Sequence, residues 1–398
     1  MKRFVASGII LFLCFFLSVF LFSKFEKKRI AQQQETIFCN AKKRKLQKEE
    51  KNFIVELKKR INIGNVPSWL NEQIQSDLSP FRESGITSQM LDTCFQRAQI
   101  YEQLGMDLAL ARYVIKKNRV QLVHIPQKWQ QDKRLESMTA ALKTLCCYID
   151  VPDVDLIITL HDALDGVDLG GPVCAFAKNI HSDHIVLIPD FEALTGNFVF
   201  LKEVKQGKEK YSWDQKIPQV FWRGASTGGV VTITNFSELP RSSAIRFSLG
   251  FPALVNARFT SLVQCIEPMS IKEKFADYFG EVVSVRDHLK YKYQLLIDGN
   301  TCAYSRAYWQ LFSDSVILKQ QSDNTQWYYR ALVPCVHYIP LNHALDDLIE
   351  KVQWAISHDD DAKTISLNAQ RFANENLTLP DIYYHLYLIL KEISKLQK

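Results

Sequence analysis

Hydrophobic and polar positions follow two different patterns along the chain. Between residues 66 and 145 apolar side chains recur mostly at helical spacing, which predicts helices over residues 100–117 and 135–145. From residue 150 the apolar runs are short and show no alternation, which is typical of strands buried on both faces of a sheet. Three such runs are residues 154–160, 172–177 and 184–189.

A second series of apolar runs follows a segment rich in lysine and glycine, residues 202–216, which we interpret as a bridge between domains. Strand-like runs then alternate with helix-like segments, and this order predicts a parallel sheet with right-handed crossovers. The predicted strands are 293–297, 315–318 and 335–340, and the predicted helices are 242–249, 303–311, 345–357 and a terminal amphipathic helix within 377–398.

The pattern therefore predicts an α/β protein with two Rossmann-like domains, 66–216 and 217–398. A cleft between two such domains, at the carboxyl ends of the strands, is the usual place for a ligand. Residues 26–65 are rich in lysine, glutamate and glutamine and predict a basic helical stalk, for which a solvated linker helix is the simple interpretation.

The N-terminal segment has a different character. Residues 4–22 carry no charge and nearly suffice to span a bilayer, so residues 1–25 are expected to form a transmembrane anchor. A cleaved signal peptide is the alternative, although no small-residue cleavage site follows. More positive charges follow the span than precede it, which favours a catalytic body in the cytoplasm.

The composition excludes few classes of function. The 398 residues carry a net charge of +6, much of it in the first sixty residues, so we expect no nucleic-acid partner. The nine cysteines show neither metal-ligand spacing nor a disulfide framework, which favours a reducing compartment.

The candidate chemistry begins at the stretch VFWRGASTGG, residues 220–229. We expect a strand that ends at Arg223, followed by a loop in which the backbone turns sharply at Gly224. In this loop Ser226 and Thr227 can donate hydrogen bonds to phosphate oxygens, and the Arg223 guanidinium can bind the phosphate directly. The stretch is neither a P-loop nor a dinucleotide fingerprint, and an arginine that merely ends a strand beside a glycine turn is the competing interpretation.

Further candidates lie where other predicted strands and helices meet. Arg241 begins a helix, and Ser305 and Arg306 follow a turn, so the arginines could surround a diphosphate, although each alone could be a surface ion-pair residue. Asp162 ends the strand 154–160 and faces the expected cleft as a candidate general base, with a loop or capping role as the alternative.

Metal-binding motifs are not convincing in this sequence. Asp153 and Asp155 form a D-x-D triplet, but it precedes its strand, so we interpret both residues as turn residues. Segment 181–184 has two histidines but no third correctly spaced ligand. Segment 358–361 is expected to be a polar loop between helices. We therefore expect neither a metal nor another cofactor.

Five segments occur in a familiar order: FWRG (221–224), KYKY (290–293), Ser305-Arg306, WYY (327–329) and HYIP (337–340). From about residue 150 onward the chain resembles glycosyltransferase family 90, which includes Rumi-like protein O-glucosyltransferases, capsule-associated enzymes and lipopolysaccharide-modifying proteins. The resemblance implies a GT-B fold, a UDP-sugar donor and an inverting, metal-independent transfer to a hydroxyl group.

By that resemblance Asp162 is the catalytic base, Arg223 and Arg306 hold the diphosphate with Ser305 beside them, and Arg241 matches the family's arginine shortly after the R-G loop. Gly224, Ser226 and Thr227 of the loop itself complete the expected nucleotide-sugar site. Thr227 departs from the family pattern, where many members carry a second arginine. With the predicted orientation, the resemblance favours an enzyme of the bacterial inner membrane that acts on an envelope glycan such as lipopolysaccharide. A protein O-glycosyltransferase in a secretory lumen and a non-catalytic, membrane-tethered sugar-nucleotide-binding protein remain the alternatives.

Overall fold

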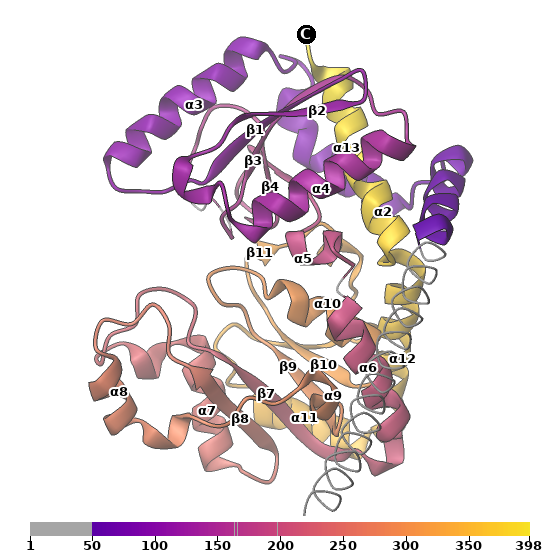
Figure 1. Ribbon diagram of the computed structural model, residues 1–398. Coiled ribbons are helices and arrows are strands. Elements are labelled where there is room, and N and C mark those ends of the chain that lie inside the picture. Colours follow the sequence, from indigo (N-terminus) through magenta and orange to yellow (C-terminus); the bar gives the residue numbers. More distant parts are fainter. Residues whose placement is uncertain (1–49, 163, 165, 197) are drawn as a thin grey trace, which may run out of the picture. The chain divides into compact units, whose positions relative to one another are not determined.

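The computed structural model describes residues 50–162, 164, 166–196 and 198–398 (Figure 1). These residues form two five-stranded sheets, one two-stranded sheet and the helices around them. Residues 57–398 form one compact unit. The predicted anchor and most of the predicted stalk lie outside the described residues. Within the described part of the chain, no helix is both long and apolar enough to cross a bilayer.

The first sheet has the strand order β2-β1-β3-β4-β6. Strands β3, β4 and β6 are parallel, whereas β1 is antiparallel to both β2 and β3. Helix α4 begins at Lys133 with Asp132 as its N-cap and contacts β2, and α2 contacts β6. The bounds are β1 Leu110–Lys116, β2 Arg119–His124, β3 Val154–Thr159, β4 Val173–Ala175, β6 Ile185–Leu187, α2 Ser68–Leu78, α3 Ser88–Gln103 and α4 Lys133–Tyr148.

The helix expected over residues 100–117 was a wrong prediction. Helix α3 ends at Gln103, and residues 110–116 form strand β1. Gly105 and Ala109 lie between them with positive φ angles of 84° and 48°, which a continuing right-handed helix does not allow. The burial of alternate residues in β1 then follows the period of a strand, and its edge partner β2 is mostly exposed.

The second sheet has the order β12-β10-β9-β7-β8, and all its pairs are parallel, as the alternation of strands and helices predicts. Helix α7 contacts β8, α10 contacts β9 and β10, and α12 contacts β10. The bounds are β7 Ile217–Ala225, β8 Val255–Ser261, β9 Tyr291–Leu296, β10 Val316–Gln320, β12 Ile339–Leu341, α7 Pro240–Gly250, α8 Pro268–Lys274, α9 Val285–His288, α10 Tyr304–Phe312, α11 Leu348–Ser357 and α12 Asp359–Asn376.

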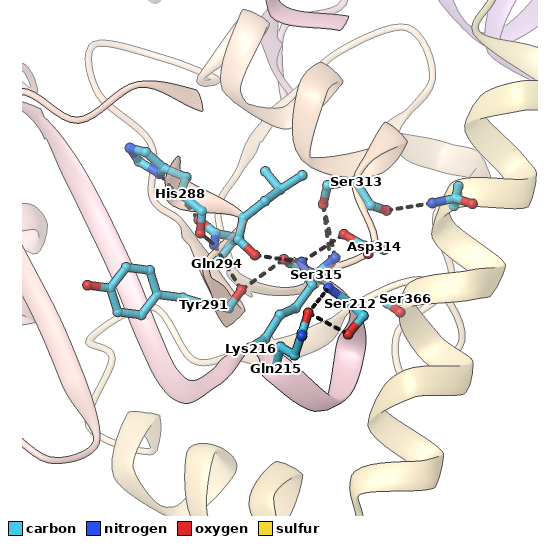
Figure 2. Close-up of polar contacts among 12 residues, drawn as sticks. Ser212, Gln215, Lys216, His288, Tyr291, Gln294, Ser313, Asp314, Ser315 and Ser366 are labelled. Atoms are coloured by element: carbon cyan, nitrogen blue, oxygen red, sulfur yellow. Dashed lines mark hydrogen bonds and ion pairs between the residues drawn. The ribbon is translucent and has the colours of Figure 1, made fainter. Parts of the chain in front are cut away.

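The amino end of β7 is fixed by the buried side chain of Lys216. Figure 2 shows its ammonium group among polar partners: Nζ donates to the Leu289 carbonyl at 2.7 Å, to Asp314 at 2.8 Å and to Ser315 at 3.1 Å. A buried charge is tolerated only when it is paired and hydrogen-bonded in this way. These contacts tie the start of β7 to the segments that precede β9 and β10.

The segment interpreted as a bridge between domains, residues 202–216, is mostly helical. Helix α6 runs from Phe198 to Lys210 and packs against α9. A β-carbon on Gly207 would lie 2.8 Å from the Arg286 carbonyl oxygen, so this glycine allows close helix packing and does not mark a linker.

The terminal helix α13, Leu379–Leu396, confirms the prediction of an amphipathic C-terminal helix. It packs against β3, α4 and the short helix α5, Phe191–Leu194, which all precede residue 217 in the chain (Figure 1). A small antiparallel pair, β5 Lys178–Asn179 with β11 Asn324–Thr325, joins the same two parts of the chain. The domain boundary at residue 217 remains a prediction from the sequence.

Candidate active site

The carboxyl ends of β7 and β9 lie at one edge of the second sheet, opposite the loop that follows β3. A cavity of about 490 Å³ opens there. It brings together every predicted site residue except Ser226. The predicted residues in its lining are Asp162, Arg223, Gly224, Thr227, Arg241, Ser305 and Arg306.

Arg223 lies near the end of β7 with its guanidinium half-buried. Its Nη1 donates to the carbonyl oxygens of Trp222 and Asn256 at 2.8 and 3.0 Å, and its Nη2 donates to Asn256 Oδ1 at 2.8 Å. Burial lowers the pKa of Arg223, and the neighbouring Arg258 acts in the same direction. These contacts fix the orientation of the guanidinium at the cavity wall.

The expected sharp turn at Gly224 was a wrong prediction, because β7 continues to Ala225. A β-carbon on Gly224 would lie 2.6 Å from Trp222 Cζ2, so the glycine makes room for the buried indole ring. The chain instead changes direction at Gly228 and Gly229, whose φ angles of 129° and 114° favour glycine.

Ser226 and Thr227 are neighbours with different surroundings. Ser226 is fully buried, and its hydroxyl donates to the Val263 carbonyl and accepts from the Val263 N–H. Thr227 lines the cavity, and its hydroxyl accepts a hydrogen bond from Arg241. Ser226 therefore joins the loop to the segment after β8, and its hydroxyl has its partners away from the cavity.

Arg241 connects two loops at the cavity edge. It is the second residue of α7, and it donates to the carbonyl oxygens of Ala225 and Asp298 at 2.8 and 2.9 Å. Burial lowers its pKa to about 10, although the nearby Asp298 acts in the opposite direction. Arg241 thus holds the loop after β7 against the loop after β9.

Arg306, in the first turn of α10, has an unpartnered donor group, as does Arg223, whose buried Nε also has no partner among the described residues. The Nη2 of Arg306 donates to the Arg223 carbonyl oxygen, while the buried Nη1 has no partner among the described residues. Burial, with a further contribution from Arg241, lowers the pKa of Arg306 to about 9. A desolvated guanidinium with a free donor is suited to bind an anion.

Asp162 follows β3 and is contacted by Arg134 before it in the chain and by Asn300 and Tyr304 after it. Its Oδ1 lies 3.3 Å from Arg134 Nη2, and its Oδ2 accepts from Asn300 Nδ2 at 3.2 Å. Tyr304 donates its hydroxyl to the Asp162 carbonyl oxygen. The side chain retains 29% exposure, so a hydroxyl group can still reach the carboxylate from the cavity.

Glu192 supplies a second carboxylate to the cavity. It lies in the first turn of α5 and lines the cavity, as Ser305 does. Burial raises its pKa, although the neighbouring Ser305 and Arg134 act against the rise. The cavity therefore holds a second carboxyl group besides that of Asp162.

The remaining wall is more apolar. His288 is held in the core against Phe221 and Trp309, and burial lowers its pKa to about 3, so the ring is neutral at pH 7. The large apolar side chains of this wall include Phe191, Phe200, Val282, Val283, Val285 and Trp309. The cavity thus combines an apolar wall, a group of arginines and a carboxylate pair.

Sequence reasoning missed four residues of this site: Arg134, Glu192, Asn300 and Tyr304. Two had a usable signal, because Glu192 soon follows strand β6 and Asn300 belongs to the turn 298–300 that ends β9. Arg134 and Tyr304 belong to no recognisable motif, and only their contacts with Asp162 reveal them.

The rejected metal motifs have structural roles. Asp155 accepts two hydrogen bonds from Arg112 across the β1–β3 pair, and Asp359, in the first turn of α12 and not in a loop as expected, bonds to Lys292 and Trp213. Within the described ranges, no cluster of three or more histidine, cysteine, aspartate or glutamate side chains has the geometry to hold a metal ion.

Comparison with known proteins places this site in context. The model of glycosyl transferase family 90 matches residues 65–398. The chain is 28% identical over 339 residues to protein O-glucosyltransferase 2 of Danio rerio, covering 82% of this chain and 62% of that protein. It is 30% identical over 262 residues to protein O-glucosyltransferase 3 of Homo sapiens, covering 62% of this chain and 48% of that protein.

A third relative is matched over more of its own length. The chain is 24% identical over 342 residues to protein O-glucosyltransferase 1 of Homo sapiens, which covers 81% of this chain and 79% of that protein. The chain therefore spans 62% of the length of the first relative and 48% of the length of the second.

Proposed function

Because the chain belongs to glycosyl transferase family 90, we propose that it transfers a sugar from a UDP-sugar to a hydroxyl group of a protein. One observation carries the proposal: the cavity joins the Asp162 carboxylate to Arg306, whose buried Nη1 has no partner among the described residues. A transferase needs a base for the acceptor and a cation for the leaving group, and both face one space here. The two sheets around this space support a GT-B assignment.

The donor would lie with its diphosphate against Arg306, Arg223 and the loop at Thr227. Arginine matches phosphate oxygens with a rigid fork of donors, and its charge persists at pH 7. The apolar wall at Val283 and Trp309 is suited to a nucleobase. In this proposal Glu192 and Asp162 lie beside the transferred sugar.

The transfer would proceed in one displacement. Asp162 accepts the proton of the acceptor hydroxyl while its oxygen forms a bond to the anomeric carbon. The bond between that carbon and the β-phosphate oxygen breaks, and UDP leaves with the electron pair. Arg306 and Arg223 stabilise the negative charge that develops on UDP, because they already point to the site before reaction. No metal is assigned a role in this proposal.

The three named relatives favour a protein acceptor and glucose as the sugar, since each is a protein O-glucosyltransferase. Lipopolysaccharide and other envelope glycans, which the sequence interpretation favoured, therefore become the second acceptor class to test. The membrane anchor and the compartment stay predictions, because residues 1–49 lie outside the described residues.

The test uses the purified full chain with a panel of UDP-sugars, beginning with UDP-glucose, and follows UDP release. Acceptors are a serine- and threonine-containing peptide array and, separately, a lipopolysaccharide core oligosaccharide. Asp162→Asn should lower turnover by about 10²- to 10⁴-fold, the usual contribution of a general base. Asp183→Asn, which changes an exposed aspartate outside the cavity, is the matched control.

Each outcome separates the candidates. Labelled peptide supports a protein acceptor, and labelled oligosaccharide alone supports an envelope glycan. An Asp162→Asn variant that turns over at the wild-type rate would refute the assigned base. A chain that binds UDP but releases none with any donor and acceptor would be a binding protein.

A further inference from the structure

The side chain of Asn300 bridges two parts of the site that the proposed reaction uses separately. Its Nδ2 donates to Asp162 Oδ2 at 3.2 Å, and its Oδ1 accepts from the Gly228 N–H, also at 3.2 Å. One carboxamide therefore touches both the base and the loop that follows Arg223. Its two polar ends match a carboxylate on one side and an N–H group on the other.

The two loops at this bridge are closely packed. A β-carbon on Gly299 would lie 2.4 Å from Thr227 Oγ1 and 2.8 Å from Arg241 Nη2, so no larger residue fits there without movement. Arg241 binds both loops through Thr227 Oγ1 and the Asp298 carbonyl oxygen. The position of Asn300 is thus set by the segments that line the diphosphate end of the cavity.

The carboxylate of Asp162 is correspondingly constrained. Arg134 holds Oδ1 from the side of the first sheet, and Asn300 holds Oδ2 from the side of the second sheet. Each carboxylate oxygen has more than one acceptor position, so an incoming hydroxyl can still donate to Asp162. Without Asn300, Asp162 Oδ2 would lose its hydrogen bond from the loop that follows β9.

We propose that Asn300 is a positioning residue that orients the Asp162 carboxylate and couples it to the Thr227–Gly228 loop. When a donor orders this loop, the same carboxamide holds the base at the angle needed to accept the acceptor's proton. This inference rests on the proposed function, because it requires Asp162 to act as a base. Asn300 itself does not touch the reacting atoms in this scheme.

Two substitutions separate the two ends of the bridge. Asn300→Asp keeps an acceptor for the Gly228 N–H but replaces the donor to Asp162 with a second negative charge. Asn300→Ala removes both contacts without adding a charge. A positioning role predicts a larger loss of kcat in N300D than in N300A, whereas simple loop support predicts the reverse order.

The experiment measures kcat, KM for UDP-glucose and the Kd for UDP on the full chain and both variants. We expect N300D to lower kcat at least tenfold while the Kd for UDP stays within twofold of the wild type. The control is Asn374→Asp, the same change at an exposed position on α12 whose Nδ2 bonds only to the Gln370 carbonyl oxygen. It should leave kcat unchanged.

The inference is overturned if N300D keeps wild-type kcat, or if UDP affinity falls in parallel with the rate. The second result would make Asn300 a donor contact. A wild-type chain without any turnover refutes the proposed function, whereas an active wild type with an equally active N300D refutes only the role of Asn300.

Discussion

The buried charge of Arg306 is unfavourable for folding, and the proposed binding of a diphosphate would offset this cost. Its side chain is desolvated, its pKa is lowered to about 9, and its Nη1 has no partner among the described residues. Burying a charge without a full set of partners costs free energy. A diphosphate placed at this guanidinium would supply the missing acceptors.

Replacing this residue therefore separates stability from binding. We expect Arg306→Met to leave the free energy of unfolding without ligand unchanged or raised, because an incompletely paired charge is removed. UDP affinity should fall at least tenfold, which corresponds to about 1.4 kcal/mol, since a charge-assisted hydrogen bond contributes about 1.5–3 kcal/mol. Chemical denaturation and calorimetric titration with UDP measure the two quantities.

Arg330→Met is the matched control, because Arg330 is exposed and its nearest charge is Glu72 at 3.7 Å. It should alter neither quantity appreciably. Unchanged UDP affinity in Arg306→Met would contradict the assignment of Arg306 to the diphosphate.

The helix α13 has a role that its position in the sequence does not reveal. It is the last helix of the chain, yet its buried face covers β3, α4 and α5, whose residues come before the second sheet. Leu386 and Ile389 on this face are each 1% exposed. The first sheet therefore depends for its core on the final helix of the chain.

Shortening one of these side chains should destabilise the protein. We expect Leu386→Ala to lower the free energy of unfolding by about 2–5 kcal/mol, the usual cost of a buried leucine-to-alanine change. Leu367→Ala in α12 is the matched control, because Leu367 is 47% exposed. Urea denaturation gives both values, and equal losses in the two variants would contradict the packing of α13 described above.

At the level of elements, the long periodic helices and the apolar runs were predictable. Helices α4, α7, α10, α11 and α13 and strands β3, β4, β6, β9 and β10 fall where the pattern placed them. The error at β1 arose because a short apolar run fits either a helix or a strand. The choice depended on pairing with β3, a segment far along the chain, where Leu110 pairs with Thr159 and Ile115 with Val154.

The pH dependence of stability belongs to the whole molecule, and buried histidines contribute to it. His385 of α13 is fully buried and stacked on Trp327 at a centroid distance of 4.5 Å. Burial lowers its pKa from 6.5 to about 3. Between these values the unfolded chain binds the proton and the folded protein does not, so this group reduces stability as pH falls.

His385→Phe should weaken this dependence by up to about 1.4 kcal/mol per pH unit between about pH 6.5 and 3. Asp190, whose pKa burial raises to about 7, acts in the opposite direction but is present in both proteins. Denaturation at a series of pH values measures the difference. His181→Phe, at an exposed histidine, should retain the wild-type dependence, and identical slopes in all three proteins would contradict the prediction.

The sequence by itself determined the α/β class, the parallel second sheet and, through its motifs, the family of the chain. It also identified the residues Asp162, Arg223, Thr227, Arg241, Ser305 and Arg306, which all face one cavity. These features are local, because apolar periodicity and turn residues act over short stretches of chain.

Only the tertiary structure decided which neighbouring side chains share a space. Ser226 and Thr227 are adjacent, yet one hydroxyl bonds to Val263 and the other lines the cavity. The contacts of Arg134 and Asn300 with Asp162 join residues far apart in the chain. Such contacts depend on how sheets and helices pack together, and no local pattern in the sequence encodes the direction in which a loop side chain points.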